Sequence, residues 1–396
     1  MRIIIATDVY YHFVCGSTQF VRNLVELLQK RGHTVLIIAP SRTIHSEYYS
    51  ADGVSLFGVA SLPTIIQKTL RLSPPFFIDN KIEKVLRDFK PDVVHLQSHF
   101  FIPAVVRRIA ERLGIPVVGT NHFMPENVFH HFHPPLMLEN FIKRQLWNHL
   151  HKFFQKCDII TTPTKTAADL LTASGFKKEV RPVSNGIDLS RFHTTHDGTY
   201  LKERYAIPKK QVLLYVGRLD PEKNLDVVIR SLADILKKVD IHFIIAGRGS
   251  EQIKLKDLAG RLGISNNITF AGYVPDSDLP ALYSIADCFI IAGNAELQSI
   301  ATMEAMASGL PVLASDSVAL PELVHGGENG FLFKERDGTE ITKFAVQIFS
   351  DLDLKRRMGA KSIEMIKVHD INTIIEKFES VYEDAIKIKK DGAIDK

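Results

Sequence analysis

Short apolar runs alternate with amphipathic segments along the whole chain. Runs such as 2–7 and 34–39 are nearly continuous in apolar residues, which predicts strands that are buried on both faces. Between the runs, apolar residues recur three or four positions apart, as in 19–31, which predicts helices with one apolar face. This alternation is typical of α/β proteins in which helices cover both faces of a parallel sheet.

The alternation occurs twice. A first series of predicted strands ends at 180–183 and a second begins at 211–216, with a polar stretch at 194–200 between them. The chain has 396 residues, which is more than a single hydrophobic core usually holds. We therefore expect two α/β domains, followed by a long amphipathic helix at about 371–390.

The composition is ordinary for a globular protein, with 45% hydrophobic and 24% charged residues. The net charge of +4 is mild and does not indicate a nucleic-acid partner. Cys15, Cys157 and Cys288 lack metal-ligand spacing, so we expect free thiols in a reducing compartment. The N-terminal apolar run is too short for a signal peptide, and no run approaches the ~20 residues that span a bilayer. These features predict a cytoplasmic protein, for which the charge allows peripheral membrane binding.

The most informative stretch is 294–315, which predicts a loop, a helix, a tight turn and a buried strand. Glu296 lies in the loop, and Glu304 lies eight residues further on, inside a helix that is expected to begin near Gln298 or Ser299. The free N–H groups and the positive dipole end of that helix suit a diphosphate, with carboxylates beside it for sugar hydroxyls. The alternative is an ordinary surface helix that carries two solvated glutamates.

Two further segments follow predicted strands of the second domain. Arg218 and Lys223 flank a turn at Pro221, where two cations would neutralise a leaving diphosphate without a metal ion, although surface charges on a turn are the alternative. Residues 247–249, Gly-Arg-Gly, permit close approach of the backbone to a nucleotide. The longer glycine fingerprint of dinucleotide sites is absent because Gln252 takes its third glycine position.

The segments G-R-L-D-P-E-K-N at 217–224, A-G-R-G at 246–249 and the stretch at 294–315 together resemble the retaining glycosyltransferases of family 4. The resemblance covers nearly the whole chain, and the segments fall in the family's order and spacing. It implies the α/β GT-B fold, with two Rossmann-like domains facing across a cleft. It also implies an acceptor domain at 1–185, a nucleotide-sugar domain at 186–370, and a return of the C-terminal helix to the first domain.

The resemblance also implies roles for individual residues. Glu304 would bind the ribose and Glu296 the transferred sugar, with Arg218 and Lys223 at the departing diphosphate. The remaining implied contacts are the amides of Gln298, Ser299 and Ile300 with the diphosphate, Gly247 and Arg248 with the nucleotide, Tyr273 and Val274 near its base, His122 with the donor sugar, and Gly16 with its phosphate or sugar. Asp8, His12, Glu126 and Asn127 are further candidates for sugar or acceptor contacts.

The sequence departs from the family at two of these places. Cys15 replaces one of two glycines in the first loop, so only Gly16 is carried over. Residues 297–299, Leu-Gln-Ser, replace the glycines that usually follow the glutamate at 296, which bears on the path of the backbone and on donor choice.

The implied reaction is retaining transfer of a hexose from a UDP- or GDP-sugar, with no cofactor or metal, to give an α-glycosidic bond. The segments T-N-H-F-M-P-E-N and A-E-L-Q-S-I-A-T-M-E are similar to bacterial enzymes that glycosylate diacylglycerol-type or phosphatidylinositol-type lipids. The alternatives are a soluble or polyprenyl-linked saccharide acceptor, a GT-B-fold sugar-nucleotide epimerase, and a module that binds the donor without turnover.

Residues 123–156 are rich in Phe, His, Lys and Arg, and 136–155 predict an amphipathic helix. One interpretation is a face that binds an anionic membrane and the lipid acceptor, with aromatic residues such as Phe153 and Phe154 entering the interface. The other is a core-packing helix with a basic side toward solvent.

Overall fold

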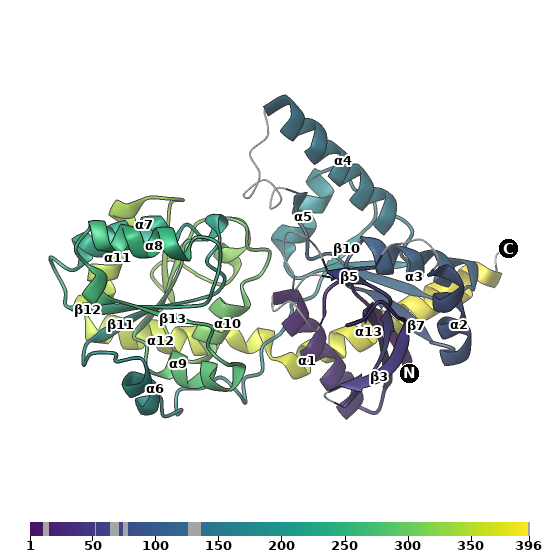
Figure 1. Ribbon diagram of the computed structural model, residues 1–396, viewed down its shortest axis with the longest axis horizontal. Helices are drawn as coiled ribbons and strands as arrows, with labels where there is room; N and C mark the ends of the chain where they lie inside the picture. Colours follow the sequence, from purple (N-terminus) through teal and green to yellow (C-terminus); the bar gives the residue numbers. More distant parts are fainter. Residues whose placement is uncertain (11–15, 52, 64–70, 74–77, 126–135, 395–396) are drawn as a thin grey trace. The chain divides into compact units, whose positions relative to one another are not determined.

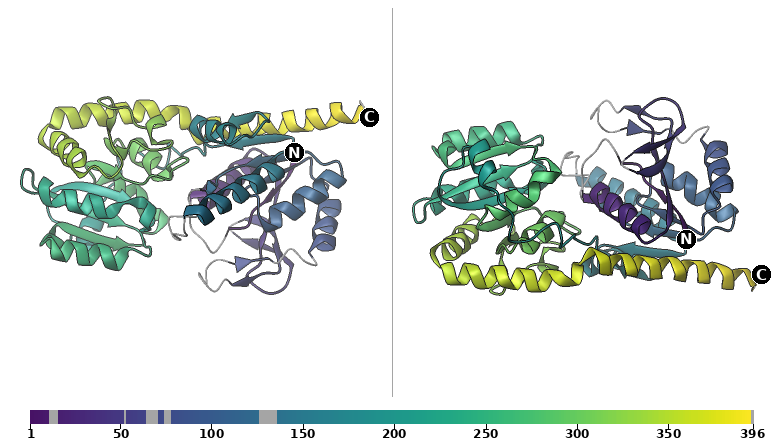
Figure 2. Two further views of the ribbon diagram at one scale, coloured as in Figure 1. Left: turned by 90° about the horizontal axis from the view of Figure 1, so that it is seen from above. Right: turned by 90° about the horizontal axis from the view of Figure 1, so that it is seen from below.

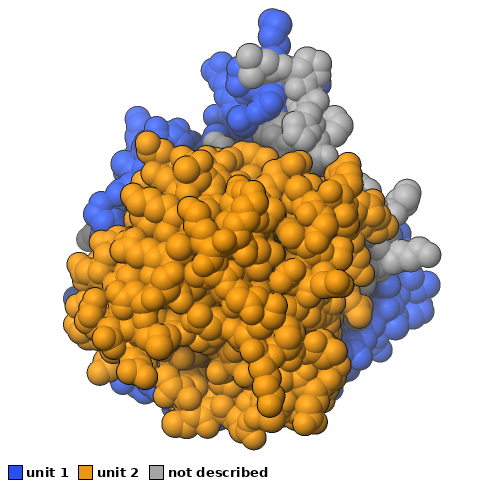
Figure 3. Space-filling view, turned by 90° about the vertical axis from the view of Figure 1, so that its left-hand side faces the viewer, with its two compact units in different colours: residues 1–125, 134–186, 372–396 blue, residues 126–133, 187–371 orange. Residues whose placement is uncertain are grey.

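The computed structural model describes residues 1–10, 16–51, 53–63, 71–73, 78–125 and 136–394. Cys15, His12, Glu126 and Asn127 therefore lie outside the described residues. The chain divides into two compact units (Figures 1 and 3). Unit 1 contains the described residues of Met1–Pro125, Pro134–Gly186 and Asn372–Lys396, and unit 2 contains Ile187–Ile371.

Unit 1 is built on an eight-stranded sheet with the order β10-β9-β8-β7-β1-β2-β4-β3. Its pairs are parallel except for β3, which runs antiparallel to β4 at the edge. The strands are β1 (Arg2–Ala6), β2 (Thr34–Pro40), β3 (Glu47–Ala51), β4 (Val54–Val59), β7 (Val93–Leu96), β8 (Val117–Thr120), β9 (Ile159–Thr162) and β10 (Val180–Pro182). A separate small pair joins β5 (Leu62–Pro63) to β6 (Arg71–Leu72).

Helices cover both faces of this sheet, as the near-continuous apolar strands require. Along β1, Ile3 and Ile5 pack with α1 and α13 on one face, while Ile4 packs with α2 and α3 on the other. The helices are α1 (Gly16–Lys30), α2 (Asp79–Phe89), α3 (Phe101–Arg112), α4 (Leu136–Phe154), α5 (Lys165–Ala173) and α13 (Ile371–Ile394). The predicted return of the C-terminal helix is confirmed, because α13 runs along unit 1 (Figure 2). Its side chains Phe378 and Tyr382 are buried in the core of that unit.

Unit 2 contains a six-stranded parallel sheet with the order β13-β12-β11-β14-β15-β16. The strands are β11 (Gln211–Val216), β12 (Ile241–Ala246), β13 (Ile268–Gly272), β14 (Cys288–Ile291), β15 (Val312–Ser315) and β16 (Gly330–Phe333). The helices are α6 (Thr199–Arg204), α7 (Leu225–Ile235), α8 (Gln252–Arg261), α9 (Leu279–Ser284), α10 (Ile300–Ala307), α11 (Gly338–Ser350) and α12 (Leu352–Ile366). Short 3-10 turns are η2 (Pro221–Lys223), η3 (Ser265–Asn267), η4 (Asp276–Asp278), η5 (Leu320–Glu322) and η6 (Lys367–His369).

The two cores of unit 2 lie on opposite faces of its sheet. Leu213 and Ile245 pack with α7, α8 and α11, whereas the neighbouring Leu214 and Ile244 pack with α9 and α10. This strict alternation follows from the two-residue period of a strand. Consecutive residues of one strand therefore supply two separate cores.

Two helices differ from the sequence prediction. Helix α1 begins at Gly16, three residues before the predicted helical pattern at 19–31. The N–H groups of a first helical turn have no intrahelical partner, so weak helix formers are tolerated there. The sequence of 337–352 predicts a single helix, but the structure ends α11 at Ser350 and begins a second helix, α12, at Leu352. Asp351 adopts an extended conformation and its side chain accepts from the Leu354 N–H, so it ends one helix and caps the next.

None of the helices in the described part of the chain is long and apolar enough to cross a membrane.

Candidate active site

The candidate donor residues of unit 2 gather at the carboxyl edge of its sheet. The chain runs from β11 outward through β12 and β13, and then returns to the other side of β11 with β14. Ligands of open α/β sheets bind at such a reversal, where the loops after the two central strands separate. Here the loop after β11 carries Arg218 and Lys223, and the loop after β14 carries Glu296.

Lys223 and Glu296 meet across this reversal. The Lys223 Nζ lies 2.6 Å from the Glu296 Oε1, and the two side chains are only 14% and 17% exposed. Two hydrogen bonds also tie the loops together, since the Asn294 backbone N–H donates to the Glu222 carbonyl and the Asn224 side-chain Nδ2 donates to the Ala292 carbonyl. The pair is thus held by both loops and faces a site that water reaches only in part.

Arg218 is held by acidic neighbours on its own turn. Its guanidinium contacts Asp220, and its Nη2 lies 2.9 Å from the Glu222 Oε1. The Tyr215 hydroxyl, buried below the turn, donates to the Arg218 carbonyl at 2.7 Å. The sequence predicted Arg218 but not the carboxylates of Asp220 and Glu222 that orient it.

The amino end of α10 lies close to the predicted start near Gln298 or Ser299, and Ser299 caps it. Ser299 is extended, and its side chain accepts from the Thr302 N–H at 3.2 Å, so the first helical residue is Ile300. Gln298 and Ser299 are almost fully buried, at 9% and 4% exposure. Such a cap contributes about 1 kcal/mol and orients the N–H groups of the first turn. These groups belong to the segment that also carries Glu296.

Glu304 lies one turn further along α10, and it is paired with a residue that the sequence did not indicate. Its Oε2 accepts from the Tyr283 hydroxyl of α9 at 2.7 Å. Burial raises the pKa of Glu304 to about 7, and the hydrogen bond from Tyr283 offsets only part of that rise. A carboxyl that changes charge near neutrality is unusual away from a functional site.

The glycines after β12 have a structural explanation. A Cβ at Gly247 would lie 1.8 Å from the Gly217 carbonyl oxygen, and one at Gly249 would lie 2.3 Å from the Leu219 carbonyl oxygen. The Arg248 carbonyl accepts from the Leu219 N–H at 3.0 Å, which ties this loop to the loop after β11. Close packing of the two loops thus requires both glycines, while the Arg248 side chain stays exposed.

The two residues expected near the base differ in exposure. Tyr273, which follows β13, is 52% exposed and presents its ring to solvent. Val274 is 5% exposed, and its side chain packs in the core with α9 and α10, which leaves only its backbone for a ligand.

In unit 1, His122 follows β8 and its ring is hydrogen-bonded. Its Nε2 lies 3.0 Å from the Gln97 Oε1, and burial lowers the pKa of His122 to about 4. Gly16 is exposed at the amino end of α1. Asp8 follows β1, accepts from the Ser98 hydroxyl at 2.5 Å and from the Ile102 N–H, and burial raises its pKa to about 6.

Helix α4 corrects one prediction about the aromatic and basic segment. Phe153 and Phe154 are 4% and 0% exposed and pack in the unit 1 core, so their expected entry into a membrane interface is wrong. They lie at the carboxyl end of α4, where the helix meets the body of the unit. The amino-terminal half projects away from that body (Figure 1) and exposes Met137, Leu138 and Phe141 by 89%, 46% and 60%.

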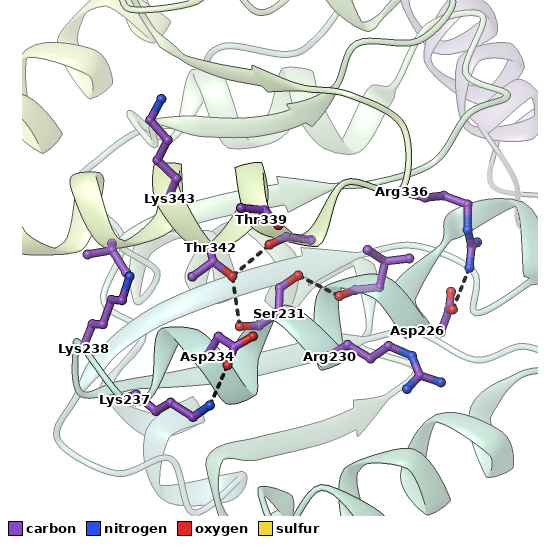
Figure 4. Close-up of a pocket in the computed structure, with 13 residues that line it drawn as sticks. Asp226, Arg230, Ser231, Asp234, Lys237, Lys238, Arg336, Thr339, Thr342 and Lys343 are labelled. Carbon is purple, nitrogen blue, oxygen red and sulfur yellow. Dashed lines mark hydrogen bonds and ion pairs between the residues drawn. The ribbon is translucent and has the colours of Figure 1, made fainter.

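In the described part of the chain, neither a metal centre nor the surface depression between α7 and α11 coincides with the candidate residues. Among the described residues, no group of three or more His, Cys, Asp or Glu side chains is arranged to hold a metal ion. A depression of about 870 Å³ lies between α7 and α11 (Figure 4), and none of the candidate residues lines it. Its charges are partly paired, since Arg336 contacts Asp226 at 2.8 Å and Lys237 contacts Asp234 at 2.7 Å.

Comparison with known proteins gives relatives along nearly the whole chain. The chain is 28% identical to an alpha-monoglucosyldiacylglycerol synthase from Streptococcus pneumoniae over 84% of its own length and 75% of the relative's. It is 25% identical to the protein of that name from Acholeplasma laidlawii, over 98% of both chains. It is also 24% identical to a GDP-mannose-dependent alpha-mannosyltransferase from Corynebacterium glutamicum, over 98% of this chain and 90% of the relative.

The fold is shared with solved structures. Anabaena HepE in complex with UDP-glucose superposes with a TM-score of 0.77 at 17% identity, over 97% of this chain and 100% of that one. Residues 14–191 match the family described as Glycosyltransferase Family 4, and residues 199–365 match the one described as Glycosyl transferases group 1. The chain therefore belongs to the GT-B glycosyltransferases of family 4 and is a hexosyltransferase.

Proposed function

We propose that this enzyme transfers a hexose from a nucleotide-sugar to a diacylglycerol-type membrane lipid, with retention, to form an α-glycosidic bond. The observation that carries the donor half of the proposal is the Lys223–Glu296 pair beside the amino end of α10, at the reversal of the unit 2 sheet. The acceptor half is supported by the exposed apolar end of α4 and by the relatives that are named as glucosyldiacylglycerol synthases.

The donor diphosphate is proposed to lie between the two cations and the first turn of α10. Arg218, Lys223 and the backbone N–H groups of Gln298, Ser299 and Ile300 would offer positive charge or hydrogen bonds there. These groups are fixed before the reaction, because ion pairs and a helix cap hold them. A preorganised positive field stabilises a leaving diphosphate more than it stabilises the bound donor, and this difference lowers the barrier.

In the proposed step, the bond between the anomeric carbon and the diphosphate oxygen breaks as the acceptor oxygen attacks the same face. The acceptor proton passes to the departing diphosphate. Glu296 is paired with Lys223, which suits a role in orienting the sugar and the cation rather than attack on the anomeric carbon. The two cations supply the charge that a divalent metal supplies in other transferases, so we propose that the reaction needs no metal.

Glu304 is proposed to accept hydrogen bonds from the ribose hydroxyls. Hydrogen bonds donated to its carboxylate would favour the ionised form, against the burial that raises its pKa to about 7. Gly247, Arg248, Tyr273 and the backbone of Val274 are proposed to surround the nucleotide. In unit 1, His122 and Gly16 are proposed to contact the donor sugar or its phosphate.

The lipid acceptor requires a surface that meets a bilayer, and α4 offers one. Leu150, Phe153 and Phe154 anchor its carboxyl end in the core, while every described residue from 137 to 149 is at least partly exposed. Met137 and Phe141 are four residues apart, which places them on one face, with the exposed Arg144 one turn further. Apolar tips followed by a cation fit the boundary between acyl chains and anionic headgroups. We therefore propose that the enzyme binds the inner face of the cell membrane as a peripheral protein.

The experiment that tests the proposal measures transfer and hydrolysis with a panel of UDP- and GDP-sugars, with and without diacylglycerol in mixed micelles. Transfer to diacylglycerol from one donor is the expected result. Hydrolysis of one donor without a lipid product would move the acceptor to a soluble or polyprenyl-linked saccharide. A free altered sugar would indicate an epimerase, and no interaction with any sugar nucleotide would refute the donor site.

The membrane half has a separate test, which is flotation with vesicles that contain anionic lipid. Phe141→Ser should reduce the bound fraction, because it replaces an exposed apolar ring. The matched control is Ile253→Ser on α8 of unit 2, where the side chain is 74% exposed and lies outside the proposed surface. Equal binding of both variants and the unmodified enzyme would refute the assignment of α4.

A further inference from the structure

A chain of buried hydrogen bonds lies behind the His122 ring in unit 1. The His122 Nε2 lies 3.0 Å from the Gln97 Oε1, and an amide oxygen only accepts hydrogen bonds. His122 must therefore carry its proton on Nε2. Because burial also lowers the pKa of His122 to about 4, the ring is neutral near pH 7 and its Nδ1 keeps a free lone pair.

The other end of the Gln97 amide is held by His95. The Gln97 Nε2 lies 3.0 Å and 3.3 Å from the two ring nitrogens of His95. Those nitrogens already have partners, because the Tyr382 hydroxyl lies 2.8 Å from Nδ1 and the Thr120 hydroxyl lies 2.6 Å from Nε2. An amino group in the plane of the His95 ring, at nearly equal distances from both nitrogens, would clash with the carbon between them. The Gln97 amino group therefore lies over the face of the ring.

These contacts leave Gln97 one favourable orientation. Its amino group faces the negative face of the His95 ring, and its carbonyl faces the His122 N–H. Rotation of the Gln97 amide by half a turn would place its carbonyl oxygen against the His95 ring face. It would also place an N–H of Gln97 against the N–H of His122. Gln97, His95 and Tyr382 are 4%, 0% and 0% exposed, so water does not relieve such a mismatch.

We propose that Gln97 is a positioning residue for the transfer reaction, which fixes the tautomer and the ring plane of His122, and that His95 and Tyr382 hold Gln97 in place. The inference rests on the proposed contact between His122 and the donor sugar. The fixed tautomer presents Nδ1 as a hydrogen-bond acceptor, which selects a sugar hydroxyl as its partner rather than another acceptor group. Through Tyr382, the C-terminal helix α13 takes part in building the site.

The test reads the tautomer directly from the imidazole nitrogen shifts of the full-length enzyme labelled with ¹⁵N-histidine. The His122 signals are assigned by their loss in His122→Asn. The unmodified enzyme should show the Nε2–H form, and Gln97→Leu should shift the ring toward Nδ1–H. Gln97→Glu should keep Nε2–H, since a carboxylate also accepts, and should raise the pKa of His122. The matched control is Gln211→Leu, which removes a half-buried glutamine bound to the Phe349 carbonyl in unit 2.

Turnover supplies the second measurement. Gln97→Leu should lower kcat by about 10- to 100-fold, because a misoriented contact loses that much, and should raise the donor KM less. Gln97→Glu should recover part of the loss. Tyr382→Phe should also lower kcat, but by less, because it loosens His95 without removing the Gln97 amide that contacts His122.

The outcomes separate the inference from the proposed function. An Nε2–H signal that persists in Gln97→Leu would overturn the inference even if the transferase reaction is confirmed. A switched tautomer with unchanged kcat would also overturn it, by removing His122 from the reaction. If Gln97→Leu does not fold, Gln97→Glu provides the test. An unchanged pKa of His122 in that variant would overturn the role assigned to Gln97. The spectra need no substrate, so they can be read even if no sugar nucleotide is turned over.

Discussion

Removal of the Lys223 cation is the sharpest test of the donor site. Lys223 is 14% exposed, and its Nζ lies 2.6 Å from the Glu296 Oε1. Lys223→Ala deletes the charge that the proposal assigns to the departing diphosphate. It also leaves the Glu296 carboxylate without its partner, at the place where negative charge develops during the reaction.

The magnitude follows from Coulomb's law. One charge about 4 Å from the diphosphate contributes about 4 kcal/mol at an effective dielectric constant of about 20. Removal of one preorganised group from other active sites lowers kcat by about 10² to 10³. We therefore expect Lys223→Ala to lower kcat by about 10³, toward the upper end of that range, because the orphaned Glu296 adds repulsion.

Folding stability should change much less. Removal of one partner from a fully buried ion pair costs about 3–5 kcal/mol, whereas exposed pairs contribute about 0–1 kcal/mol. Lys223 and Glu296 are 14% and 17% exposed, so a cost of about 1–3 kcal/mol is expected. The double variant Lys223→Ala with Glu296→Gln should regain part of this stability and should not regain turnover.

The assay is the initial rate of hexose transfer to diacylglycerol in mixed micelles, with thermal melting measured by circular dichroism on the same samples. The matched control is Lys254→Ala, because Lys254 is 74% exposed and pairs with Glu251 at 2.6 Å on the surface of unit 2. The control should retain its turnover. A Lys223→Ala enzyme that melts normally and keeps kcat within about tenfold of the unmodified enzyme would refute the electrostatic role.

Three further predictions concern other parts of unit 2. Burial raises the pKa of Glu304 from 4.5 to about 7, so folding favours the protonated carboxyl. The stability that this preference contributes is fully present below pH 4.5 and is lost as the pH rises through about 7. Glu304→Gln should therefore flatten the pH dependence of the melting temperature between these two values, and an unchanged slope would contradict the raised pKa. Ser299→Ala removes the cap of α10 and should lower the free energy of unfolding by about 1 kcal/mol in a urea titration, whereas an unchanged midpoint would argue against the cap. Gly247→Ala should destabilise the enzyme by more than the ~1–3 kcal/mol of ordinary overpacking, because its Cβ would lie 1.8 Å from the Gly217 carbonyl oxygen, and normal melting would contradict that contact.

The sequence by itself determined the α/β class and most of the elements, because buried parallel strands must be apolar throughout and the helices between them must be amphipathic. It also located the start of α10 to within two residues and the tight turn that ends it at Gly309, because such signals act through neighbouring backbone. Local signals failed at Asp351, where a single extended residue divides α11 from α12 and acts as the cap of the second helix.

Only the tertiary structure decided which side chains meet. Lys223 and Glu296 are 73 residues apart in the sequence, and Tyr382 reaches His95 from 287 residues away. Burial likewise separated Phe153 and Phe154, which pack in the core, from Phe141, which is exposed on the same helix. Periodicity gives each residue a face of its helix, but the depth of a side chain depends on what the rest of the fold places against it.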